Sequence, residues 1–566
     1  MRKALISTAA VLAAVIFLLL GTLPPRPRAV SWAGDPELAR RTIAGAYHVH
    51  TTRSDGAGDR AAVASAAARA GLKFVIITDH GDGTRGPEPP AYIDSVLCLD
   101  GVEISTNGGH YVALGMGATP YPLGGEASAV VEDVARFGGF GFAAHPDSAR
   151  PELAWTDWTV PVDGLEWLSA DSEWRDESRA RLARAVIDYS VRPGPALASM
   201  LDRPVATLNR WDALTARRPV LAIASHDAHG GIGRGAEQGG TLRAVLRGVP
   251  SYEASFRSFS TRVILDRPPG GDAAADARQV LDAIRRGRMF TVIDAVATPG
   301  AVDFRGWQGA EGFANPSQMG STLPPGPSVV SVDVSLPSGA EMVLIGDGGE
   351  FRKTSNGHHV NGIETASGAV RVEVRVPGAP GTPPVPWLVT NPIYFLRPVS
   401  SGVTPSTDSA IVPLSPDVPW HLEKDPGSTG TLSASAGVVS LDYTLRPGDR
   451  ASQFVALVAE LRGRPGSFRT IVFTASAAHP ARVSVQLRYP NGGGERWGRS
   501  VYLDSTPRDV VVDLDDLLLA DRQTRSAPAS PAATALLFVV DLTNASPGEA
   551  NTISIKRIGF GRWLNP

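Results

Sequence analysis

Cysteine is nearly absent from this sequence, because Cys98 is the single one among 566 residues. An intramolecular disulfide is therefore excluded, and so are zinc sites built from pairs of cysteine thiolates. An excess of either charge is also lacking, since 54 basic residues stand against 57 acidic ones. The overall charge thus gives no reason to expect a nucleic-acid polymer as a partner. Any metal ion must be held by histidine, aspartate and glutamate.

The sequence also lacks a convincing internal repeat or heptad pattern. At 566 residues the chain is too long for one hydrophobic core, and several domains are expected. Its hydrophobic content of 43% is typical of globular protein, and its 60 glycines and 46 prolines indicate many turns and short strands.

An apolar run from Ala4 to Leu23 follows the basic residues Arg2 and Lys3. The run is about as long as a helix that crosses the hydrocarbon core of a membrane. We therefore expect residues 1–33 to be either a signal peptide or an uncleaved membrane anchor. Both alternatives imply an extracytoplasmic protein, in the periplasm or at the cell surface.

Short β-rich segments alternate with helical ones from Ala44 to about Gly240, the pattern of βα units around a parallel sheet or barrel. For example, Lys73 to Thr78 reads as a buried strand, and Asp59 to Ala70 as a helix that Gly71 terminates. We expect this α/β unit to span residues 34–298.

Beyond Gly300 the sequence changes to alternating strands such as Ser328 to Ser335 and Val370 to Val376. These patterns predict an Ig-like β module at 299–398. A linker is expected at 399–431, where Ser, Thr and Pro are frequent, and a jelly-roll-like β-sandwich at 432–566.

Seven of the eleven histidines lie before residue 230. His48 and His50 end a predicted strand, and residues two apart on a strand point to the same side, so both imidazoles can reach one metal ion. Asp227 and His229 repeat this spacing after another predicted strand. Further candidate ligands stand in or just past β-rich segments: His80, Glu103 and His145.

Six segments resemble, in their expected order, the motifs of the PHP (polymerase and histidinol phosphatase) family. They are YHVHTTRSDG (47–56), ITDHGDG (77–83), GVEIS (101–105), GGHYVALG (108–115), AAHPDS (143–148) and SHDAHG (225–230). The resemblance covers about residues 44–235. It implies a distorted (β/α)7 barrel with two or three Zn, Mn or Fe ions, and in most characterised members the hydrolysis of phosphate esters.

The resemblance also implies how the ligands are shared among the ions. A first ion would be bound by His48, His50, Glu103 and Asp227. These four residues would be catalytic through the nucleophilic water bound to that ion. Glu103 would bridge to a second ion at His145 and His110, although His110 could instead be an ordinary histidine at a strand start. A third ion would be bound by Asp55, His80 and His229, with Asp55 standing where some members of the family have histidine.

Several nearby residues have other expected roles. His226 should face away from its neighbour Asp227, and Asp79 should orient His80 or cap a turn rather than bind metal. The segment from Glu166 to Trp174 lines the cleft or forms a solvated loop.

The downstream sequence widens the choice of substrate. Ser328 to Phe395 is similar to the small module that follows the barrel in carbaryl-hydrolase-like members, which implies carbamate or carboxylic ester hydrolysis as an alternative to phosphate esters. RWGRSVYLD (496–504) resembles part of a galactose-binding-type jelly roll, in which Trp497 and Tyr502 would contact sugar or belong to the core. A carbohydrate- or cell-surface-binding protein, with the barrel as scaffold, is the third alternative.

Overall fold

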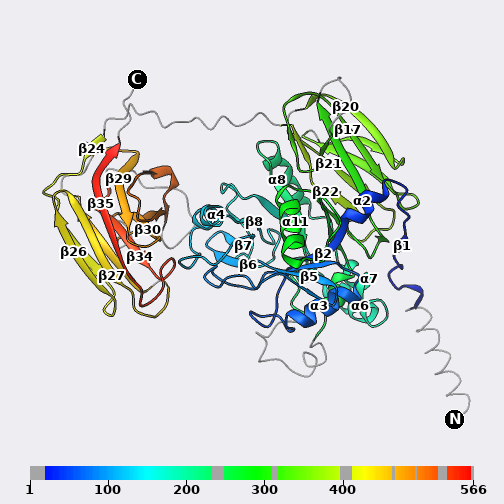
Figure 1. Cartoon of the computed structure of the whole chain (residues 1–566), viewed down its shortest axis with the longest axis horizontal. Coiled ribbons are helices and arrows are strands. Elements are labelled where there is room, and N and C mark those ends of the chain that lie inside the picture. The colour runs from blue at the N-terminus through cyan, green and yellow to red at the C-terminus, as the bar shows by residue number, and fades with distance from the viewer. Residues whose placement is uncertain are drawn as a thin grey trace, which may run out of the picture.

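The strands of the described residues form six sheets, and Figure 1 shows how they are arranged. The structure, a computed structural model, describes residues 20–231, 248–308, 316–347, 349–366, 368–395, 411–450, 452–461, 466–490, 494–519 and 532–561. The predicted apolar segment therefore lies mostly outside the described residues. Among the helices that are described, none is both long and apolar enough to span a membrane.

The described α-helices lie between Pro36 and Arg285, and several of them begin at polar caps that the sequence supplies. The side chains of Asp59, Ser178 and Asp272 each accept a hydrogen bond from the backbone of the first helical turn. The helices are α2 (Pro36–Arg41), α3 (Arg60–Arg69), α4 (Ala127–Arg136), α5 (Ala170–Arg175), α6 (Arg179–Tyr189), α7 (Pro193–Ala198), α8 (Val205–Thr215), α10 (Tyr252–Phe256) and α11 (Ala273–Arg285). The helix predicted from Asp59 to Ala70 is confirmed as α3, and Gly71 follows it with a φ of 82°.

A five-stranded sheet carries several of the predicted strands. In spatial order it contains β10 (Leu221–Ser225), β9 (Gly164–Ser169), β8 (Phe140–Ala143), β7 (Gly109–Leu114) and β6 (Val102–Thr106). The first three run parallel, whereas β7 and β6 are antiparallel to their neighbours.

A twelve-stranded sheet runs through both the predicted α/β unit and the predicted Ig-like module. Its main path is β16 (Thr322–Leu323), β23 (Ile393–Phe395), β21 (Gly368–Arg375), β22 (Leu388–Thr390), β12 (Met289–Val292), β11 (Ser260–Ile264), β2 (Thr42–Val49), β3 (Phe74–Ile77), β5 (Val96–Asp100) and β4 (Ala91–Ile93), with β18 (Glu341–Gly346) and β19 (Gly349–Thr354) beside β21. The parallel pairs are β2 with β3, β3 with β5, and β16 with β23. The boundary between residues 298 and 299, predicted to separate the α/β unit from the Ig-like module, stays a prediction.

The predicted distorted (β/α)7 barrel is wrong. The first part of β2 pairs in antiparallel fashion with β11, so the sheet continues outward through β12 and β22 instead of closing. In the described part of the chain, short bridges link the two sheets, at Val49 with Ala228 and at His80 with Glu103. The α/β unit is therefore built on two open sheets in contact, and the structure as a whole is mainly β.

Two smaller sheets complete the N-terminal part. They are a pair formed by β1 (Arg28–Ala29) and β13 (Ala297–Thr298), and a four-stranded sheet of β15 (Ser317–Gln318), β14 (Val302–Gln308), β17 (Gly326–Val334) and β20 (His358–Ala366). The strand predicted from Ser328 to Ser335 is confirmed by β17 and the strand from Val370 to Val376 by β21.

The C-terminal part is a β-sandwich, as predicted, and lies beside α4 (Figure 1). One six-stranded antiparallel sheet contains β26 (Thr429–Ser435), β27 (Val438–Thr444), β35 (Ala550–Gly561), β29 (Thr470–Ala477), β32 (Arg508–Asp513) and β24 (Ile411–Pro413). The other contains β25 (Trp420–Lys424), β28 (Phe454–Glu460), β34 (Ala535–Asp541), β30 (Ala481–Arg488), β31 (Arg496–Leu503) and β33 (Leu518–Leu519). Residues 411–431 of the predicted linker thus belong to the sandwich, because their backbone completes sheet edges; residues 396–410 lie outside the described part.

A buried ion pair joins the sandwich to the N-terminal part. Arg482 on β30 donates two hydrogen bonds to Asp133 on α4, of 2.7 and 2.8 Å. Both side chains are 1% exposed. Glu132, on the same helix but 40% exposed, also accepts from Arg482. Removing one partner of such a pair leaves a buried charge without compensation.

Asp133→Ala is therefore expected to lower the free energy of unfolding by about 3–5 kcal/mol, because Arg482 loses its buried counter-ion. Glu132→Ala, the matched control on the exposed side of α4, is expected to cost less than about 1 kcal/mol. Chemical denaturation of the full chain measures both. Equal effects of the two substitutions would contradict the assignment of Asp133 as the anchor.

Candidate functional site

The nine predicted metal ligands come together where the two open sheets meet. His48 and His50 stand at the end of β2, and Asp55 follows in the next loop. The others come from the ends of β3, β8 and β10 and from the hairpin of β6 and β7: His80, Glu103, His110, His145, Asp227 and His229.

The backbone is distorted at three of these residues. His48, His145 and Asp227 have positive φ angles of 62°, 27° and 43°. Residues other than glycine rarely adopt this region, and such strain of about 1–3 kcal/mol per residue gathers at functional sites. At His48 the distortion accompanies a shift in register between β2 and β3. Both histidines of the first motif therefore reach the same site through an irregular strand end rather than through simple alternation.

The carboxylate of Glu103 lies at the centre of the cluster and is 1% exposed. Its Oε1 atom is 2.6 Å from Nδ1 of His110 and 3.0 Å from Nε2 of His145. Its Oε2 atom faces three other imidazole nitrogens, namely Nε2 of His48 at 3.2 Å, Nε2 of His50 at 3.2 Å and Nδ1 of His80 at 3.1 Å. Glu103 therefore lies between the histidines of both sheets.

Two further carboxylates complete the cluster. Oδ1 of Asp227 is 3.2 Å from Nε2 of His50. Oδ2 of Asp55 is 3.2 Å from Nε2 of His229 and 3.7 Å from Nε2 of His80. Asp55 is the most open of these groups, with 46% of its side chain exposed, so it marks the side from which a ligand can enter.

The donor atoms fit divalent cations. Four overlapping groups have potential ligand atoms within 4.8 Å of one another: His50, Asp55, His80 and His229; His48, Glu103 and His145; His48, His50 and Asp227; and His80, Glu103 and His110. Within the described residues, the buried atoms Nε2 of His48, Nε2 of His50 and Oε2 of Glu103 have no hydrogen-bond partner. Buried polar atoms normally have one, so atoms left without one and aimed at each other fit a metal ion.

The charges inside the cluster also favour a bound cation. Burial lowers the pKa of His50, but the carboxylates of Asp227 and Glu103, each 3.2 Å from its Nε2, raise it to about 10. Burial raises the pKa of Glu103, but the neighbouring histidines, His48 foremost, hold it well below its usual range. The carboxylates therefore stay ionised and attract positive charge, whether protons or cations.

Glu166 on β9 contacts the cluster directly, whereas the sequence interpretation named it only as the start of a segment that lines the cleft or forms a solvated loop. Its Oε1 is 2.6 Å from Nδ1 of His48, and its Oε2 accepts a 2.8 Å hydrogen bond from the backbone of His145. With Nδ1 of His48 donating, the lone pair of Nε2 points toward Glu103, as metal-binding histidines require. The sequence signal for this role was a carboxylate in the strand GLEWLS, all of whose residues are buried.

Two of the expected supporting roles can now be compared with the structure. Asp79 accepts hydrogen bonds from Thr51, Arg53 and Ser54, so it organises the turn after β2. His226 faces away from the cluster as predicted, because it stacks on Phe259 at 4.2 Å and burial lowers its pKa to about 4.

His110 differs from the other histidines of the cluster. Its Nδ1 lies 2.6 Å from Glu103, and its Nε2 lies 3.2 Å from Oγ of Ser105. Both ring nitrogens thus have partners, so His110 is placed to orient Glu103.

The two aromatic residues proposed as sugar contacts are engaged elsewhere. Trp497 is 5% exposed and belongs to the core of the sandwich. Tyr502 packs against the N-terminal part, with the guanidinium of Arg136 4.0 Å from its ring centre.

No family model and no curated protein matches the chain. Among solved structures, a family 11 carbohydrate-binding module of a cellulosomal cellulase of Clostridium thermocellum is 16% identical over 28% of this chain and 99% of the module, with a TM-score of 0.23. The N-terminal cellulose-binding domain of Cellulomonas fimi β-1,4-glucanase C is 16% identical over 26% of this chain and 90% of the domain, with a TM-score of 0.17. An agarase is 8% identical over 26% of this chain and 23% of its own, with a TM-score of 0.19. At TM-scores this low, these similarities indicate nothing about the function of the chain.

Glu166→Ala is expected to weaken binding of Zn²⁺ or Mn²⁺ by about 10- to 100-fold, because His48 loses the partner that orients it. Glu132→Gln, a carboxylate on α4 outside the cluster, serves as the control and should leave affinity unchanged. Isothermal titration calorimetry of the metal-stripped proteins with Zn²⁺ or Mn²⁺ measures the affinities. Wild-type affinity in Glu166→Ala would contradict this role.

Proposed function

We propose that this chain is a metal-dependent hydrolase whose preferred substrates are phosphate esters. The convergence of nine histidine and carboxylate ligands, with buried donor atoms left without hydrogen bonds, carries this proposal. The resemblance of the six sequence motifs to the PHP family agrees with it. Two or three Zn²⁺, Mn²⁺ or Fe²⁺ ions are the proposed cofactors, and export of the protein is proposed from its apolar N-terminus.

Bound divalent ions would supply an activated water and positive charge for the oxygen that gains negative charge. The chain itself holds the donors in place for this chemistry. Glu166 fixes the orientation of His48, and Glu103 spans the cluster from the side of His50 to that of His145. Buried surroundings strengthen these electrostatic contacts and keep competing water away.

The charge of the cluster favours an anionic substrate. Three carboxylates among the ligands, Asp55, Glu103 and Asp227, contribute three negative charges. Two or three divalent ions would exceed this charge, so the loaded site attracts a phosphate group more strongly than a neutral ester. The exposed edge at Asp55 and His80 is the proposed entry side.

Hydrolysis is expected to depend on metal and on the buried ligands. Mn²⁺-loaded protein should hydrolyse p-nitrophenyl phosphate or bis(p-nitrophenyl) phosphate, and excess chelator should abolish the reaction. His50→Ala should lower kcat/KM by at least about 100-fold, since a direct ligand matters at least as much as its supporting partners. His479→Ala removes an exposed histidine of the sandwich and should leave the rate unchanged.

An aryl carbamate and an aryl carboxylic ester belong in the same assay. Faster chelator-sensitive turnover of either one would replace the phosphoesterase proposal by the alternative hydrolase. Activity that survives both the chelator and His50→Ala would contradict catalysis at this site.

A further inference from the structure

A polar cavity of about 460 Å³ lies between the sandwich and the N-terminal part. We call it the junction pocket and define it by six of its lining residues: Ser105, Glu126, Arg450, Gln486, Arg496 and Asp541. Its floor comes from β30, β31 and β34, and its opposite wall from the end of β6 and the approach to α4.

The alternation of β30 creates the polar floor. Val483, Val485 and Leu487 point into the sandwich core, so Ser484 and Gln486 point outward into the pocket. Gly498 lies beside Gln486 on the neighbouring strand, and a Cβ atom there would come within 2.6 Å of the Gln486 side chain. Glycine thus leaves room for the amide to lie in the floor of the pocket.

The amide of Gln486 has an unused hydrogen-bonding atom. The residue is 6% exposed, and its Nε2 donates to Oγ of Ser484 at 2.9 Å. Its Oε1 has no hydrogen-bond partner among the residues that the structure describes. A buried acceptor without a partner destabilises the protein, and a ligand with a hydroxyl donor would supply the missing hydrogen bond.

The charges of the junction pocket balance. Arg482, which also lines the cavity, is neutralised by Asp133. Arg450 is likewise paired, with Asp82 at 3.4 Å. Arg496 then stands against Glu126 and Asp541, and burial raises the pKa of both carboxyls, that of Glu126 to about 7, so they are not both fully ionised near neutral pH. A site for an anion would carry an excess of positive charge, whereas balanced charges with many hydrogen-bonding groups suit a neutral ligand.

One part of the wall is apolar. Phe454, Leu518 and Leu519 line the same cavity and are partly buried. Sugars present both hydroxyl groups and C–H surfaces, so polar side chains beside such an apolar wall match a saccharide better than a fully polar or a fully apolar molecule.

We infer that the junction pocket binds a neutral saccharide, with Oε1 of Gln486 accepting a sugar hydroxyl and Arg496 and Asp541 contacting others. This site differs from Trp497 and Tyr502, which are packed into the core and the interface.

The junction pocket is connected to the metal-ligand cluster through one side chain. Ser105, in its wall, is 3.2 Å from Nε2 of His110 and stands two residues after Glu103 on β6. A bound saccharide therefore lies against the hairpin that carries these ligands. Saccharide binding does not depend on the proposed hydrolysis, so the two can be tested apart.

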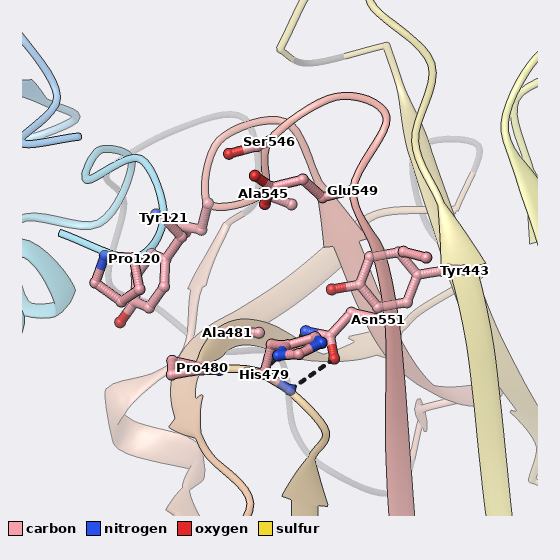
Figure 2. Close-up of a pocket in the computed structure, with 12 residues that line it drawn as sticks. Pro120, Tyr121, Tyr443, His479, Pro480, Ala481, Ala545, Ser546, Glu549 and Asn551 are labelled. Atoms are coloured by element: carbon pink, nitrogen blue, oxygen red, sulfur yellow. Dashed lines mark hydrogen bonds between the residues drawn. The ribbon is translucent and has the colours of Figure 1, made fainter. Parts of the chain in front are cut away.

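A second cavity of about 420 Å³ offers a comparison (Figure 2). It lies between Tyr121 of the N-terminal part and sandwich residues that include Tyr443, Ser546 and Asn551. The Asn551 side chain is held by the backbone of His479 on both sides, at 3.0 Å each. None of the described residues lining this cavity has a buried side-chain nitrogen or oxygen without a hydrogen-bond partner. The second cavity therefore lacks the feature that indicates a ligand in the junction pocket.

The test is a glycan array of neutral gluco-, galacto-, manno- and xylo-oligosaccharides and their uronic-acid counterparts, probed with the full-length protein. Calorimetry with the best ligand then gives the affinity. Gln486→Leu keeps a similar volume but removes the amide, and it should weaken binding at least about 10-fold, as expected for one lost buried hydrogen bond. Arg496→Ala should also weaken it.

Two matched controls separate this proposal from the others. Ser546→Ala alters the second cavity and should bind as the wild type does. His48→Ala/His50→Ala should also keep its saccharide affinity, even though its metal binding is lost. Absence of binding to every neutral glycan, preference for the uronic acids, or wild-type affinity in Gln486→Leu would overturn the inference.

Discussion

The buried carboxylate of Glu103 is the group on which the candidate site depends. Its two oxygens face five histidines from four different segments, and its backbone bridges to His80 across the junction of the two open sheets. An isolated carboxylate at 1% exposure would be expensive, so the histidines and any cations they bind stabilise its charge. The same contacts therefore hold the sheets together and assemble the metal-ligand cluster.

The strands reach this carboxylate through distorted ends. β2 and β10 supply ligands just where their regular pairing fails, and His48 and Asp227 adopt positive φ angles there. Glu166 stabilises this arrangement through its contacts with the His48 side chain and the backbone N–H of His145. The Arg482–Asp133 pair joins the sandwich to α4, and the wall of the junction pocket reaches the cluster through Ser105 on β6.

Local features of the sequence predicted much of this structure. The helix from Asp59 to Ala70 and the buried strand from Lys73 to Thr78 depend on nearby residues, and they lie where the patterns indicated. The residues of the candidate site could be picked out from the sequence because their motifs stand next to strand ends, and the structure brings them together. The closed barrel was wrong because strand partners depend on distant segments: β11 pairs with β2 in antiparallel fashion, and no local pattern encodes that choice. The role of Glu166 likewise depends on a contact 118 residues away.

Metal content tests the central claim most directly. The full chain, reconstituted with Zn²⁺ or Mn²⁺ and passed through a desalting column, should retain two or three equivalents by elemental analysis. His48→Ala/His50→Ala should retain markedly fewer at an unchanged far-ultraviolet circular dichroism spectrum. A wild-type protein that retains no metal, or a double variant that retains as much as the wild type, would contradict the account.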